Sequence, residues 1–146
     1  MTDPEFTTSL ELLRWVGWAQ MQAGLEWFRE RDISREQGFV LGLLKQHPGS
    51  SQREIAETTR TSAASVSSLL QGLEKRGLVE RRTDAESART KRVYATPDGI
   101  ALIEGFEPAM LAVEATILAP LDEHERDAFH RLLVKITSVL PRPVRD

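Results

Sequence analysis

The sequence contains no cysteine, and this absence removes several kinds of chemistry at once. Without thiols the chain cannot form a disulfide, bind a metal through thiolate or sense oxidants by thiol chemistry, and it needs no oxidising compartment. It also lacks an apolar run approaching the roughly 18 residues that span a bilayer, and acids stand at its start where a secretory signal would have its positive region. We therefore expect a cytoplasmic protein with no membrane partner.

The combinations of residues that indicate an enzyme are also missing. The sequence shows no nucleophile with a base and an orienting group, no Gly-rich phosphate loop and no carboxylate pair. His124 and His130 lie near four acids at positions 122–127, but a helix dipole explains acids in a first turn, and the histidine spacing does not suit a metal. We expect no catalysis, no metal and no cofactor.

The length and charge of the chain point to one domain with a basic centre. The 146 residues, 40% of them hydrophobic, suffice for a single core, which predicts one domain over 1–146. The net charge of -3 is unevenly distributed, because residues 51–96 carry nine Lys and Arg against six Asp and Glu while both flanks are acidic. Such asymmetry is expected where one part of a protein faces a polyanion, although chance fluctuation would also produce it.

Capping signals predict where the helices begin. A capping box, in which Ser, Thr or Asp is followed three residues later by Glu or Gln, starts at Thr8, Ser34, Ser51 and Asp122. The last helix is predicted to include Val139 and to stop at Pro141. The first helix is apolar around most of its circumference, so it needs cover on more than one side. We expect a partner subunit to supply this cover, the alternative being burial within one chain.

The middle of the sequence changes from helical to strand periodicity. Val66, Leu69, Leu70 and Leu73 follow a cap at Thr61 or Ser62 at helical spacing, and a glycine at 77 closes that helix. Residues 78–82 and the alternating residues 91–96 are predicted strands around a polar tip. Thr96 and Pro97 then start a long helix towards position 119, with a bend expected at Pro108.

The order of these elements is that of a winged helix-turn-helix. We predict a mainly α fold with a small two-stranded β wing, in which residues 34–96 form the winged helix-turn-helix, and 8–31 and 97–140 form a helical dimerisation part. In such folds the second helix enters the major groove of DNA, and here that helix covers 61–76. Its predicted outward residues are Ser62, Ala63, Ser65, Ser67, Ser68 and Gln71. Small hydroxyl side chains approach phosphates and base edges closely, although they are also ordinary helix-surface residues.

Basic side chains surround this predicted helix. Arg89, at the tip of the hairpin, is predicted to enter the narrow minor groove, where the negative potential is enhanced. The predicted phosphate ligands are Arg53, Arg60, Arg81, Arg82, Lys91 and Arg92. For each of these cations the alternative is an ordinary solvated side chain or a structural role.

Two stretches, QREIAETTRTSAASVSSLLQGLEKRGLVERR and KRVYATPDG, resemble the MarR family of dimeric bacterial winged-helix transcription regulators. The resemblance implies that the terminal helices of two subunits intertwine, and that a small aromatic ligand binds between the dimerisation helices and the winged domain. Candidate residues for lining that pocket are Trp18, Gln22, Phe39 and Leu43. The chain departs from the family pattern at Ser87, where the wing usually has an Asp two residues before the arginine, and at Ser68, where an arginine is common.

These features together predict a homodimer that binds a pseudo-palindromic operator in double-stranded DNA. Its function is expected to be transcriptional regulation, as a repressor released by a small-molecule effector. The alternative is a dimeric helical protein-interaction module without an operator.

Overall fold

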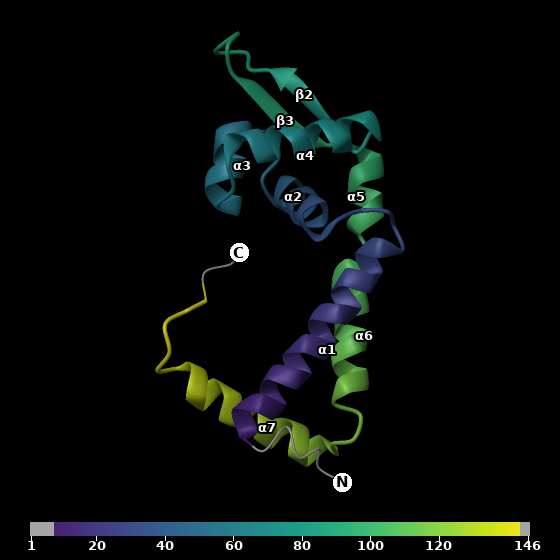
Figure 1. Ribbon diagram of the computed structural model, residues 1–146, viewed down its shortest axis with the longest axis vertical. Helices are drawn as coiled ribbons and strands as arrows, with labels where there is room; N and C mark the ends of the chain where they lie inside the picture. The colour runs from purple at the N-terminus through teal and green to yellow at the C-terminus, as the bar shows by residue number, and fades with distance from the viewer. Residues whose placement is uncertain (1–7, 144–146) are drawn as a thin grey trace. The chain divides into compact units, whose positions relative to one another are not determined.

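The computed structural model describes residues 8–143, so the acidic start of the sequence and residues 144–146 lie outside it. The chain forms two compact units, whose elements are labelled in Figure 1. The central unit runs from Gly24 to Glu107, and the terminal unit combines the residues up to Ala23 with those from Pro108 onward.

The central unit contains the end of α1 (Ser9–Arg29), four further helices and a small sheet. The helices are α2 (Arg35–Gln46), α3 (Gln52–Thr59), α4 (Ala63–Lys75) and α5 (Pro97–Ile103). The strands are β1 (Ser50–Ser51), β2 (Val79–Thr83) and β3 (Lys91–Ala95). Two helices joined by a tight turn and followed by a hairpin make a winged helix-turn-helix, which confirms the predicted fold class.

Local hydrogen bonds explain why these helices begin and end at these positions. Ser34 and Ser51 each form a complete capping box, and Ser62 caps α4 by accepting from the Ser65 amide at 3.1 Å. Gly77 closes α4 at φ +69°, a left-handed conformation that glycine adopts without strain. Arg60 ends α3 in the same left-handed region, at φ +52°, and so forms the tight turn before α4. The predicted helix starts in this unit are therefore confirmed.

The core of the central unit is formed by apolar residues from its helices and from the sheet. The fully buried side chains among them are Val40, Leu41, Leu44, Ile55, Val66, Leu70, Leu73 and Val93. Leu69, predicted to face this core, is only half-buried. Gly99 fixes the approach of α5, because a Cβ at this position would lie 2.1 Å from the carbonyl oxygen of Leu78.

The sheet has one strand more than the sequence predicted. Its order is β1-β3-β2, with both pairings antiparallel, and the added strand β1 consists of two residues opposite Val93 and Arg92. A strand this short shows no alternation of apolar and polar residues, which is the signal used to recognise strands in sequence. The wing hairpin β2–β3 itself agrees with the prediction, and Val93 on it is buried.

The helix predicted to run from residue 97 towards 119 is two helices, and the expected bend at Pro108 is wrong. The break lies at Glu104 and Gly105, between α5 and α6 (Phe106–Ile117). Pro108 falls in the first turn of α6, where a backbone N–H has no partner within the helix and none is lost. The last helix, α7 (Glu123–Thr137), ends before Val139, which the sequence had assigned to it.

The terminal unit comprises α1 up to Ala23, α6 from Pro108, and α7. Capping boxes at Thr8 and Asp122 begin α1 and α7 as predicted. Thirteen large apolar side chains of this unit are exposed: Leu10, Leu12, Leu13, Trp15, Val16, Trp18, Met21, Leu111, Leu132, Val134, Ile136, Val139 and Leu140. Neither α6 nor α7 has a buried residue. Within residues 8–143, no helix is long and apolar enough to cross a membrane.

Candidate nucleic-acid interface

The outward face of α4 is polar and accessible in the central unit. Of the six residues predicted for this face, Ser67 is half-buried and the other five are exposed: Ser62, Ala63, Ser65, Ser68 and Gln71. The Ser62 hydroxyl already makes two hydrogen bonds within the chain, because it caps the helix and also donates to the Ser65 hydroxyl at 2.9 Å. The side chains of Ser68 and Gln71 lie further along the helix and are exposed to solvent.

Two predicted phosphate ligands stand at the turn between α3 and α4. Arg53 projects from the first turn of α3 with 88% of its side chain exposed and pairs with Glu57 at 3.1 Å. Arg60 is exposed at the turn itself. Between the two helices lies an open surface hollow of about 430 Å³, lined by Gln52, Arg53, Ala56, Glu57, Arg60, Thr61 and Ala63. Both arginines therefore border one concave surface beside the start of α4.

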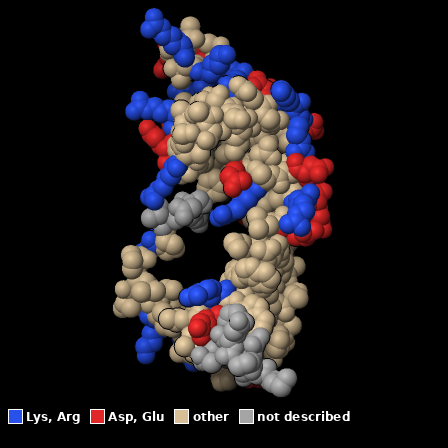
Figure 2. All heavy atoms as spheres, viewed as in Figure 1, with Lys and Arg blue, Asp and Glu red and all other residues tan. Residues whose placement is uncertain are grey.

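The wing carries further cations, and Lys and Arg gather over this end of the central unit in Figure 2. Arg82 lies on β2 with 61% of its side chain exposed, over the ring of Tyr94 and next to the Glu80 carboxylate. Lys91 is exposed on β3, and Arg89 is exposed in the loop between the strands. Within residues 8–143, no ion pair involves Arg60, Arg89 or Lys91, so these three charges are available to a polyanion.

The structure places Arg81 apart from the exposed cations of the wing. It is opposite the buried Val93 on the sheet, and its side chain is only 19% exposed. Its Nε atom lies 3.2 Å from a carboxylate oxygen of Glu74, on α4. Arg81 thus neutralises an acid within the fold and joins β2 to α4.

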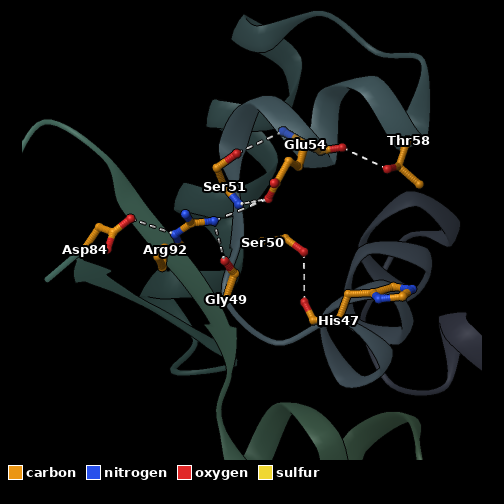
Figure 3. Close-up of polar contacts among 8 residues, drawn as sticks. All are labelled: His47, Gly49, Ser50, Ser51, Glu54, Thr58, Asp84 and Arg92. Carbon is orange, nitrogen blue, oxygen red and sulfur yellow. Dashed lines mark hydrogen bonds and ion pairs between the residues drawn. The ribbon is translucent and has the colours of Figure 1, made fainter. Parts of the chain in front are cut away.

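Arg92 lies at the centre of a network of polar contacts (Figure 3). Its Nε atom donates to Asp84 at 3.1 Å, and its Nη1 atom donates to the Gly49 carbonyl at 3.3 Å. The same Nη1 atom lies 3.7 Å from the Glu54 carboxylate, which in turn accepts from the Ser51 amide at 2.7 Å. Arg92 therefore connects the wing loop with the first turn of α3.

Asp84 is held in its ionised form by its neighbours. Its carboxylate accepts a hydrogen bond from the backbone N–H of Glu86 at 3.1 Å, and this contact is the main cause of a lowered pKa. The hydrogen bond from Arg92 lowers the pKa further, while removal from solvent opposes both effects. The side chain of Asp84 is 17% exposed, so the pair with Arg92 is largely covered.

Sequence reasoning did not identify three acids that organise this surface. Glu74 pairs with Arg81, and Glu54 and Asp84 pair with Arg92. The sequence contained a signal for the first pair, because Arg81 stands two residues after Val79 and strand alternation places both on the same face. The contacts of Arg92 with Gly49 and Glu54 depend on β1, which the sequence did not reveal.

The residues predicted for a ligand pocket are divided between the two units. Trp18 and Gln22 lie on α1 in the terminal unit, where Trp18 is 55% exposed and Gln22 half-buried. Phe39 and Leu43 lie on α2 in the central unit, both half-buried. His124 and His130 are exposed on α7, and the part of the chain that the structure describes holds no cluster of potential metal ligands.

A helix-turn-helix with an accessible polar second helix and a cationic hairpin defines the chain as a winged-helix protein of the kind that binds DNA. Comparison with known proteins is more specific. A model of the MarR family matches residues 31–90. The HTH-type transcriptional repressor Rv2887 of Mycobacterium tuberculosis is 32% identical over 98 residues, which are 67% of this chain and 70% of that protein. The transcriptional regulator HosA of Escherichia coli is 28% identical over 105 residues, 72% of this chain and 78% of its own length.

Solved structures agree with this assignment. The chain is similar to MepR, a transcription regulator of the Staphylococcus aureus multidrug efflux pump MepA, with a TM-score of 0.85 and 32% identity over 92% of this chain and 100% of MepR. It is also similar to MepR in a complex with DNA, with a TM-score of 0.75 and 32% identity over 89% of this chain and 98% of that one. The protein belongs to the MarR family of transcriptional regulators.

Proposed function

We propose that the protein is a homodimeric repressor that binds a pseudo-palindromic operator in double-stranded DNA and is released from it by a small molecule. The observation that carries the proposal is the surface of the central unit, where the exposed face of α4 lies between unpaired cations of the turn and of the wing. The similarity to DNA-bound MepR supports it. A protein acting on DNA in this way is expected in the bacterial cytoplasm.

Each part of this surface has its own task in the proposal. Ser65, Ser68 and Gln71 contact base edges in the major groove, and the methyl group of Ala63 is suited to a thymine methyl. Arg53, Arg60, Arg82 and Lys91 hold phosphates, while Arg89 reaches the minor groove. Arg81 and Arg92 have no place among the phosphate ligands, because only 19% and 37% of their side chains are exposed beside their carboxylate partners, whereas Arg53 and Arg82 keep 88% and 61% exposure beside theirs.

The terminal unit is proposed to form the dimer. Its exposed apolar side chains come from α1, α6, α7 and the residues just after α7, and a concentration of exposed large apolar side chains is typical of an interaction surface. A second copy of the chain offers the same apolar surface and would cover both. A dimer also presents two α4 helices, which fit half-sites about 34 Å apart on DNA.

Effector release follows if a ligand binds better to a dimer with the wrong spacing of its two α4 helices. Trp18, Gln22, Phe39 and Leu43 remain the proposed ligand-contacting residues, because each has accessible surface on α1 or α2. The similarity to MepR bound to ethidium bromide, at a TM-score of 0.68 and 32% identity over 92% of this chain and 98% of that one, supports an aromatic cation as a first test compound.

The decisive experiment is to sequence the DNA that co-purifies with the protein, followed by binding titrations on the recovered sequence at several salt concentrations. We expect a preference for a pseudo-palindromic site, with the logarithm of the affinity falling by about 0.9 per phosphate contact for each tenfold rise in salt. A purified dimer with no preference for any duplex, including its own upstream region, would instead support the protein-interaction alternative.

A further inference from the structure

We propose that Arg92 is a positioning residue for DNA binding, which fixes the wing by clamping the loop residue Asp84 to Gly49 and to the start of α3. This inference rests on the proposed DNA-binding function, and it assigns Arg92 a role other than phosphate contact. The clamp is the set formed by Arg92, Asp84, Glu54 and the carbonyl of Gly49, shown in Figure 3.

The clamp joins three segments that the chain brings together only by folding. Asp84 follows β2, Arg92 lies on β3, and Gly49 precedes β1. Arg92 is paired with Ser51 of β1 on one side and with Arg82 of β2 on the other. The guanidinium is therefore placed where β1 meets the wing hairpin, and this single side chain donates to Asp84 and to Gly49.

The same acid also shapes the loop that carries Arg89. The second carboxylate oxygen of Asp84 accepts from the Glu86 amide at 3.1 Å, and the Asp84 amide donates to the Thr90 carbonyl at 2.8 Å. The Thr90 amide donates to the Ser87 carbonyl at 3.2 Å, which closes the loop on itself. Holding Asp84 therefore sets the base of the loop and, through it, the direction of Arg89.

The clamp also separates the roles of two neighbouring arginines. Arg82 and Arg92 are directly opposite on β2 and β3, where like charges destabilise a strand pair unless each is neutralised. Arg82 pairs with Glu80 and keeps 61% of its side chain exposed, whereas 37% of the Arg92 side chain is exposed between two carboxylates. Arg82 is thus the member of the pair that faces DNA, and Arg92 is the member that holds the wing.

The test uses two substitutions that remove the same charge from the same loop. Asp84→Asn weakens the clamp, whereas Glu86→Gln removes a charge from an exposed side chain that contributes only its backbone to the network. We expect Asp84→Asn to lower operator affinity by about tenfold, the order of effect of losing a hydrogen bond between charged groups. Glu86→Gln should leave the affinity unchanged or raise it, because it removes repulsion from the phosphates.

If Arg92 were a phosphate ligand, Asp84→Asn would raise operator affinity instead of lowering it, since the substitution would free a cation and remove an anion beside the DNA. Unchanged or increased affinity of Asp84→Asn would therefore overturn the proposal. The double variant Asp84→Asn with Arg92→Met should bind the operator no more weakly than Arg92→Met alone, because the two substitutions remove the same contact, that between Arg92 and Asp84. Additive losses in that cycle would also overturn it.

A second readout does not depend on DNA. Hydrogen exchange of the amides at 84–90 in the free full-length protein should accelerate in Asp84→Asn and Arg92→Met, remain unchanged in Glu86→Gln, and be partly restored in Arg92→Lys. Equal exchange in all variants would show that there is no clamp. If the wild-type protein binds no duplex, the proposed function fails, while the exchange measurement still decides whether Arg92 holds the wing.

Discussion

At the scale of single residues, the wing shows how a strand pattern divides similar side chains between different tasks. Arg81 and Arg82 are neighbours, but alternation places Arg81 with buried Val93 and leaves Arg82 over the ring of Tyr94. The two arginines thus differ in role because they differ in exposure, and a count of basic residues in the sequence does not distinguish them. The sequence indicated a cationic wing, whereas the distribution of roles depends on acids that lie elsewhere in the chain, including Glu54 and Glu74.

Arg89 is the residue with the largest expected effect on DNA affinity. It is exposed in the wing loop, and within residues 8–143 no ion pair competes for its charge. We expect Arg89→Ala to weaken operator binding by about tenfold or more at moderate salt, as measured by fluorescence anisotropy. Arg35→Ala, which removes an equal charge from the exposed first turn of α2, is the control and should have little effect. Equal losses of operator affinity in both variants would mean that Arg89 acts only through the net charge of the protein and makes no specific contact.

The lowered pKa of Asp84 predicts how the clamp responds to acid. The ordinary value is 3.8, and a carboxyl group whose pKa is depressed by folding stabilises the native state above that value. This contribution disappears as the pH falls below 3.8 and through the lowered pKa. Thermal unfolding of the wild type and of Asp84→Asn should therefore differ at neutral pH and converge in acid. A difference that persisted at low pH would mean that the carboxylate charge is not what stabilises the wing.

At the scale of elements, local signals located the helices and nonlocal contacts decided the remainder. The capping boxes at Ser34, Ser51 and Asp122 involve groups three residues apart, so the sequence alone could predict them. The two-residue strand β1 exists because β3 lies beside it, and two residues are too few to form a sequence pattern that predicts this pairing. The break at Glu104 and Gly105 has only a weak local signal, because glycine is tolerated inside a helix, whereas Pro108 gives a strong signal that has no effect in the first turn of α6.

The packing of α5 against the start of β2 should be sensitive to a single methyl group. A Cβ at position 99 would lie 2.1 Å from the Leu78 carbonyl oxygen, so α5 must move to accommodate it. We expect Gly99→Ala to reduce the free energy of unfolding by about 1–3 kcal/mol in a denaturant titration. In Gly42→Ala, by contrast, nothing lies within 4 Å of the new Cβ, and the helix interior should gain about 0.5–1 kcal/mol. Equal changes in the two variants would contradict the close contact.

At the scale of the whole molecule, burial differs sharply between the two units. The buried hydrophobic side chains lie between Trp27 and Ile103, whereas the exposed large hydrophobic ones lie at 10–21 and 111–140. The sequence predicted this in part, because the circumference of α1 was too apolar for one contact surface. A periodicity identifies a surface that needs cover but carries no information on which molecule provides it.

The proposed dimer depends on apolar side chains of α7. Leu132 is 54% exposed on this helix, and a carboxylate there would be buried without a partner if two copies associate through it. We expect Leu132→Glu to shift the protein from dimer to monomer in sedimentation at micromolar concentration. The melting temperature of the wild type should depend on protein concentration, and that of the variant should not. Arg131→Glu changes the charge of the adjacent exposed residue and serves as the control. Association unaffected by Leu132→Glu would place the interface on other elements.

The composition of the terminal unit from both ends of the described chain has a consequence during translation. The central unit is complete in sequence once Glu107 has been added to the nascent chain, whereas α6 and α7, with which α1 up to Ala23 forms the terminal unit, are made after it. Synthesis of the residues from there to Thr137 takes roughly 1.5 to 6 s at bacterial rates of about 5–20 residues per second. During this interval α1 exists without α6 and α7, and because Trp15 and Trp18 on it are exposed, we expect chaperones to bind this helix while the chain is still being made.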